Sequence, residues 1–127
     1  MRIRAVNGAG SSQTIATFAG SSGNFTALGD VTAYSDIRYK KNIHTIDNAI
    51  NKVLNLNGVY YNRTDIDPDK KRIGLIAQDV EKVFPELVRD GDFKTVNYNG
   101  LIGVLIEAVK ELKTEVEELK KNILIDR

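Results

Sequence analysis

A serine and a lysine five positions apart are the residues of this chain best placed to do chemistry together. They belong to the run Ser35-Asp36-Ile37-Arg38-Tyr39-Lys40-Lys41-Asn42-Ile43. A serine hydroxyl becomes a nucleophile when a base takes its proton, and a lysine acts as that base in its neutral form, which burial and nearby cations favour. Arg38 and Lys41 are such cations, whereas Asp36 acts in the opposite sense unless it is otherwise paired. The spacing suits a turn that folds back. An ordinary charged loop is the alternative, because such pairs are common by chance.

Other kinds of reactive site have less support. The chain has no cysteine, which excludes thiol catalysis, disulfides and thiolate metal ligands. Its single histidine, His44, leaves a Ser-His-Asp triad open in principle, although a lone histidine more often packs or caps. Asp65, Asp67 and Asp69 alternate like part of a calcium loop but lack its glycine and its final glutamate, so we interpret them as a solvated loop. We expect no metal and no cofactor.

Length and charge bound the possible roles. The 127 residues are 42% hydrophobic and carry 18 basic and 17 acidic side chains, for a formal net charge of +1. This length suits one small globular domain with an appendage, and a domain this small gains stability from oligomerisation. The balanced charge argues against a nucleic-acid partner, and no apolar segment is long enough to cross a bilayer. We expect neither nucleic acid nor a membrane among the partners.

The chain changes character at Ser35. Only three charged residues precede it, together with five of the ten glycines. Short apolar runs there predict strands, and too few large apolar residues are present to bury a core. We therefore expect this part to pack against copies of itself or to continue a longer fibrous body; a disordered linker is the alternative. The predicted strands are residues 3–6, 14–19, 24–28 and 31–34, with turns at Asn7-Gly8, Gly20–Gly23 and Gly29-Asp30.

The middle of the chain predicts a small α+β unit. Thr45 is a plausible N-cap for a helix that stops at Asn57-Gly58. A second short helix is closed by Pro85 and turns Val80, Val83 and Phe84 inward. The remaining predicted elements are a strand at 59–63, a buried strand at 72–77, the helix at 78–84 and a hairpin over 87–96.

The last segment predicts a long helix, from about residue 99 to 124, with a coiled-coil seam. Apolar residues alternate three and four positions apart without a break. An amphipathic helix packed on its own domain is the alternative, because the seam is short. Branched residues at heptad position a with leucine at heptad position d favour a coiled coil of two parallel helices. The seam consists of Ile102, Val109, Val116 and Ile123 at a, and of Leu105, Leu112 and Leu119 at d.

Three ordered motifs give the chain a specific resemblance. The first is the run from Ser35 to Ile43, the second runs from Ile73 to Glu86 and the third from Lys94 to Ile102, which leads into the helix. Together they resemble the C-terminal intramolecular chaperone domain of bacteriophage tailspikes, endosialidases and neck appendage proteins, also called the peptidase S74 family. The resemblance covers about residues 30–124. Asp79 and Asn97 depart from the residues common in that family.

The resemblance implies a homotrimer in which the C-terminal helices form a parallel three-stranded bundle, and this replaces the preference for two strands. It implies three parts: residues 1–34 as the end of a trimeric β-rich fibre, 35–98 as a β-rich chaperone core and 99–127 as the helix. The domain would fold the preceding fibre in the host cytoplasm during phage assembly. The fibre would remain in the virion and the released domain would not.

The resemblance also implies self-cleavage between Tyr34 and Ser35, with Ser35 as nucleophile and Lys40 as base. Ser35 follows the bond directly, so its hydroxyl can attack the Tyr34 carbonyl through a five-membered ring. Asp36 is a possible supporting residue, and the amide of Asn42 is a candidate oxyanion donor. Two alternatives stay open: a trimeric end-cap without catalysis, and a receptor-binding fibre tip that displays the loop at 65–71.

Overall fold

The computed structural model describes residues 1–6, 8–20 and 23–125. Two predicted turns, Asn7-Gly8 and Gly20–Gly23, therefore include residues outside the described ones. The chain divides into two compact units, one made of Met1–Asn42 and Asn62–Lys71 and the other of Ile43–Tyr61 and Arg72–Arg127. Small antiparallel sheets and one long helix make the fold α+β, as the sequence predicts. The predicted boundary between residues 34 and 35 stays a prediction.

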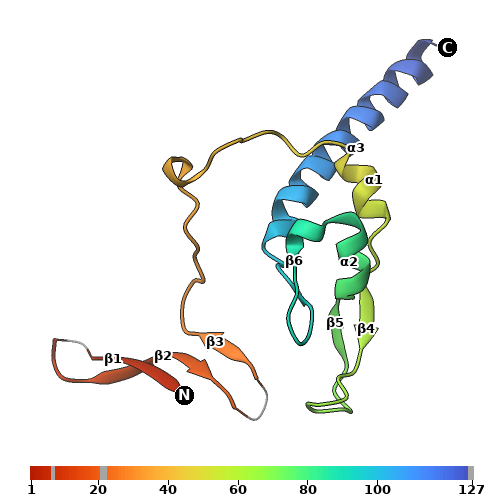
Figure 1. Cartoon of the computed structure of the whole chain (residues 1–127). Helices are drawn as coiled ribbons and strands as arrows, with labels where there is room; N and C mark the ends of the chain where they lie inside the picture. The colour runs from red at the N-terminus through yellow and green to blue at the C-terminus, as the bar shows by residue number, and fades with distance from the viewer. Residues whose placement is uncertain (7, 21–22, 126–127) are drawn as a thin grey trace. The chain divides into compact units, whose positions relative to one another are not determined.

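The first unit holds a three-stranded antiparallel sheet in the order β1-β2-β3 (Figure 1). The strands are β1 (Arg2–Val6), β2 (Ser12–Phe18) and β3 (Phe25–Ala27), which confirms three of the predicted strands with ends shifted by one or two residues. The predicted strand at 31–34 was wrong, because this segment has no strand partner within the described chain. Phe18 and Phe25 contact each other with ring centroids 4.9 Å apart, yet no described side chain of the sheet is buried.

The second unit encloses the hydrophobic core. Val80 of α2 (Ala77–Val83) and Phe84, which directly follows that helix, pack with Val104 of α3 (Gly100–Ile125), and all three are buried. The inward direction predicted for α2 is confirmed. Branched aliphatic side chains from surrounding segments pack around these three, so the core is small and almost entirely aliphatic. The partly buried neighbours are Ile46, Val53, Leu56, Leu75, Val83, Leu87, Val88 and Val96.

Two short hairpins flank this core. The strands β4 (Val59–Tyr61) and β5 (Arg72–Gly74) pair antiparallel, as do β6 (Val88–Arg89) and β7 (Thr95–Val96), and the 3-10 turn η2 (Pro85–Leu87) precedes β6. The hairpin predicted over 87–96 is confirmed. The strand predicted as buried over 72–77 is shorter and open on one face, because a two-stranded sheet leaves Ile73 74% exposed.

Glycine is required at one position of this sheet. The Tyr98 hydroxyl accepts a hydrogen bond from the Leu75 backbone N–H at 3.0 Å. A Cβ atom at Gly74 would lie 2.8 Å from that hydroxyl oxygen, closer than real Cβ contacts come. The missing side chain at Gly74 therefore lets the Tyr98 hydroxyl approach the end of β5.

The helix α1 (Ala49–Leu54) begins later than the sequence predicts. Thr45 is not its N-cap. The cap position belongs to Asn48 in a left-handed conformation, without a side-chain cap bond. Instead the Glu111 carboxylate of α3 accepts hydrogen bonds from the N–H groups of Ala49 and Ile50, at 2.9 and 2.8 Å. These bonds, that from Ile50 first, lower the pKa of Glu111. A carboxylate distant in the sequence thus replaces the predicted local cap.

The helix α3 confirms the predicted long helix and presents two different faces. One face packs on the domain through Val104, Ala108 and Glu111. The seam residues lie on another face and are between 39% and 65% exposed in the single chain. The alternative of a helix packed on its own domain is therefore correct for the first face only. Among the described helices, none is long and apolar enough to cross a membrane.

Candidate active site

A single turn of 3-10 helix, η1 (Ile37–Tyr39), reverses the chain between the serine and the lysine. The N–H of Tyr39 donates to the carbonyl of Asp36 at 3.1 Å, and the N–H of Lys40 donates to the carbonyl of Ile37 at 3.0 Å. A 3-10 turn advances only about 2 Å per residue. The residues that flank it therefore come close together, and the predicted fold-back is confirmed.

The side chains of Ser35 and Lys40 meet across this turn. The Lys40 Nζ atom donates a hydrogen bond to the Ser35 Oγ atom at 2.7 Å. Both residues belong to the same chain and both are exposed. Within the described part of the chain, no carboxylate lies within 4.0 Å of Lys40 Nζ. The distance suits proton transfer from the hydroxyl to a neutral amine.

Asp36 is occupied by Arg38. Its Oδ1 atom accepts from the Arg38 backbone N–H at 2.8 Å and from Nε at 3.0 Å, while Oδ2 accepts from Nη2 at 2.8 Å. The side-chain bond to Arg38, followed by the backbone bond, lowers the pKa of the Asp36 carboxyl group. Asp36 is also the N-cap of η1. The acidic neighbour of Lys40 is therefore paired elsewhere.

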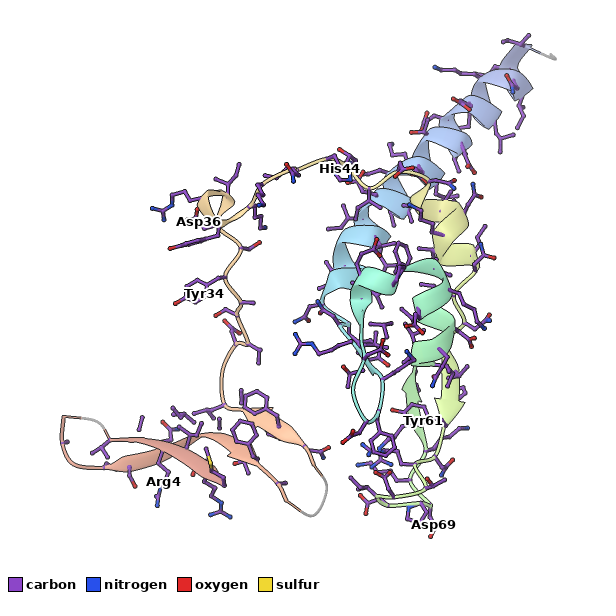
Figure 2. All side chains as sticks on the ribbon, viewed as in Figure 1. Arg4, Tyr34, Asp36, His44, Tyr61 and Asp69 are labelled. Atoms are coloured by element: carbon purple, nitrogen blue, oxygen red, sulfur yellow. The ribbon has the colours of Figure 1, made fainter. Side chains whose placement is uncertain are left out.

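The bond before Ser35 is accessible. The side chain of Tyr34 is 100% exposed, and Figure 2 shows it pointing away from the chain on an extended stretch before the Asp36 turn. Because Ser35 follows this bond directly, its Oγ atom needs no other element to approach the Tyr34 carbonyl carbon.

The remaining candidates lie outside this contact. Asn42 follows Lys40 by two residues and has a φ of 54°, in the left-handed region that asparagine tolerates. Its role as an oxyanion donor stays a prediction. His44 belongs to the second compact unit, whereas Ser35 belongs to the first, and a triad through it stays untested. Among the described residues, no group of three or more His, Cys, Asp or Glu could hold a metal.

The sequence did not predict the roles of Arg38 and Glu111. Arg38 counted only as a cation near Lys40, although an aspartate at a cap position followed two residues later by arginine was a signal for their pairing. Glu111 gave no signal at all, because its bonds to α1 span 61 and 62 residues of sequence. Contacts that far apart depend on the tertiary fold and have no local pattern.

Comparison with known proteins identifies the class of this domain. Residues 35–89 match the family model described as chaperone of endosialidase. This match begins at Ser35, includes the turn, α1, α2 and β6, and agrees with the resemblance carried by the sequence motifs. Residues 35–89 are therefore similar to the chaperone-of-endosialidase family, which supports a chaperone domain of this kind.

The curated relatives are phage fibre proteins. The chain is 36% identical over 99 residues to the long tail fiber protein Gp37 of Enterobacteria phage K3, which covers 71% of this chain and 8% of the relative. It is 37% identical over 108 residues to the Gp37 of Enterobacteria phage Ox2, covering 77% of this chain and 42% of that protein. The chain thus spans less than half the length of these relatives.

Proposed function

We propose that this chain is a fibre-assembly chaperone that trimerises the end of a phage fibre and then releases itself by cutting the bond between Tyr34 and Ser35. The observation that carries the cutting step is the 2.7 Å contact between Lys40 Nζ and Ser35 Oγ, immediately after that bond. The family match at residues 35–89 and the fibre relatives support the chaperone role.

The cutting step is an acyl shift followed by hydrolysis. The Ser35 Oγ atom attacks the Tyr34 carbonyl carbon, and neutral Lys40 Nζ accepts the hydroxyl proton. The C–N bond then breaks, the proton passes from Lys40 to the leaving amine of Ser35, and an ester joins Tyr34 to Ser35 Oγ. Water hydrolyses this ester, which leaves a Tyr34 carboxylate and restores the hydroxyl. No cofactor takes part, and each chain turns over once.

The seam of α3 supports the assembly step. Its seven apolar residues are on average about half exposed in the single chain and lie on a face that the domain does not use. Parallel helices bury such a stripe by knobs-into-holes packing. A homotrimer brings three fibre ends together, which raises their effective concentration and fixes their register. We propose assembly in the host and a fibre that stays in the virion.

Release of the chaperone domain would make disassembly of the fibre difficult to reverse. While attached, the trimer of helices favours both assembly and reassembly of the strands that precede it. After the cut, a strand that leaves the fibre has lost this tether, so its return is slow. The fibre's persistence then depends on its unfolding rate rather than on an equilibrium.

Intact mass spectrometry of the purified full chain tests the proposal. We expect a fragment that begins at Ser35 to accumulate with time, and Ser35→Ala to stay at full length while it still forms trimers in analytical ultracentrifugation. Thr32→Ala is the matched control, because it removes a nearby exposed hydroxyl and should be cut normally. A wild-type chain that stays uncut while trimeric would contradict the cutting step.

A trimeric end-cap without cutting is the second candidate. The relatives are named as fibre proteins rather than as peptidases, and the α3 seam needs nothing from the Ser35 turn to associate. In that case the chain would remain one piece in the assembled fibre. The mass measurement above separates the two roles directly.

A further inference from the structure

Three charged side chains share the η1 turn, but only two of them pair with each other. Asp36 and Arg38 form the ion pair, with the Oδ2 atom 2.8 Å from Nη2. Lys40 stands four residues after Asp36 and close enough for its charge to act on that carboxylate. Without Arg38, Asp36 is the acidic group in position to attract the Lys40 ammonium.

Arg38 holds this carboxylate with a geometry that lysine does not match. Both Asp36 oxygens accept from its guanidinium, and Oδ1 accepts in addition from its backbone N–H. Planar guanidinium and carboxylate groups form two parallel bonds, whereas an ammonium acts as a point charge. The competition for Asp36 therefore favours Arg38 and leaves Lys40 directed at Ser35.

The choice of partner matters for the reaction. A carboxylate next to a lysine favours the charged ammonium, which has no lone pair to accept a proton. We propose that Arg38 is a positioning residue that acts by holding Asp36 away from Lys40, so that the Lys40 amine faces the Ser35 hydroxyl. This inference rests on the proposed self-cleavage. It explains how Lys40 can act as a base although Asp36 lies only four residues away.

The expected effect is modest because the groups are largely solvated. The Arg38 side chain is 79% exposed and the Asp36 side chain 38% exposed, and exposed ion pairs are weak. We expect loss of Arg38 to slow cutting by about three- to tenfold. The other titratable groups of the segment are the exposed Lys41, Tyr34 and Tyr39, which this substitution leaves unchanged.

The test compares the rates of Arg38→Gln and of Arg38→Gln with Asp36→Asn in the full chain. The single variant should cut more slowly, with its pH–rate profile moved to higher pH by up to about one unit. Adding Asp36→Asn should restore both, because asparagine keeps the cap acceptor but not the charge. Arg63→Gln is the matched control. It removes the Arg63–Asp65 pair, which has the same two-residue spacing, and should leave the rate unchanged.

A second measurement does not depend on cutting. In chains that also carry Ser35→Ala, limiting acetic anhydride labels only neutral amines, and mass spectrometry gives the labelling of Lys40 relative to Lys41. Arg38→Gln should lower this ratio and the added Asp36→Asn should restore it. If the wild-type chain does not cut, the proposed function fails while the labelling still decides this inference. An unchanged ratio in Arg38→Gln, or a double variant as slow as the single one, would overturn it.

Discussion

The Ser35–Lys40 turn and the α3 seam differ in how far a single chain satisfies their contacts. The turn needs only residues 35–40, and its proposed nucleophile and base already meet at 2.7 Å. The seam residues, by contrast, are between 39% and 65% exposed in the single chain, and their proposed role requires helices from other chains. The geometry of the proposed cutting step is thus supplied by one chain. Its solvent environment is not, because lysine bases in proteins are desolvated and this pair is exposed in the single chain. Assembly is the step that could change that environment.

The largest expected effect comes from a change that should slow cutting strongly without affecting assembly. Lys40→Ala removes the proposed base, and loss of a general base typically slows a reaction by a hundredfold or more. Trimers should form as in the wild type, because the seam is untouched. Time-resolved mass spectrometry and ultracentrifugation of the same sample measure both properties. Lys41→Ala is the control at the adjacent position and should cut at the wild-type rate; an equal loss there would show that the charge of the segment matters rather than the contact.

The second change breaks the seam and leaves the turn intact. Leu112→Asp places a charge in the middle of the seam and removes apolar burial of roughly 2 kcal/mol per chain on assembly. We expect monomers at micromolar concentration, with the fold of the single chain preserved by circular dichroism. Because assembly would no longer change the environment of the turn, cutting should slow about tenfold. Monomers that cut at the wild-type rate would show that the turn is sufficient by itself.

The third change concerns how α3 holds the rest of its domain. The Glu111 pKa is lowered in the folded chain, so its contribution to stability is present above its ordinary pKa of 4.5 and is lost as the pH falls through the lower folded value. Glu111→Gln should therefore lower the melting temperature by roughly 5 °C at pH 7 and by much less at pH 3. Thermal unfolding at the two pH values measures this. A difference that stays constant with pH would mean that the charge of Glu111 is irrelevant.

The smallest expected effect is on stability alone, with cutting and assembly unchanged. Tyr98→Phe removes the hydroxyl that accepts from the Leu75 N–H and should cost about 1 kcal/mol of unfolding free energy. Urea denaturation measures it, with Tyr39→Phe, at a residue that is 81% exposed, as the control. Altered cutting or assembly in Tyr98→Phe would reveal a coupling between the core and these regions that the contacts do not indicate.

The sequence predicted what depends on local pattern. The heptad spacing located α3 within a residue at each end, and the hydrophobic spacing identified the inward side of α2. The Ser35–Lys40 fold-back followed from the motif and its spacing. The start of α1 was missed because its cap comes from Glu111, and the 31–34 strand was overpredicted because alternating residues alone supply no partner strand. The pairing of Asp36 with Arg38 required atomic geometry to choose between two neighbouring cations.

The Glu111 cap has a consequence for the order in which the protein is made. A helix of six residues is too short to persist alone in water, and α1 obtains its N-terminal hydrogen-bond acceptors from Glu111, about sixty residues later in the sequence. During synthesis, α1 therefore stays incomplete until the ribosome has passed residue 111 and α3 has emerged. A chain that terminates early lacks both the seam and a finished α1. The same carboxylate that joins two helices thus makes completion of α1 depend on the synthesis of α3.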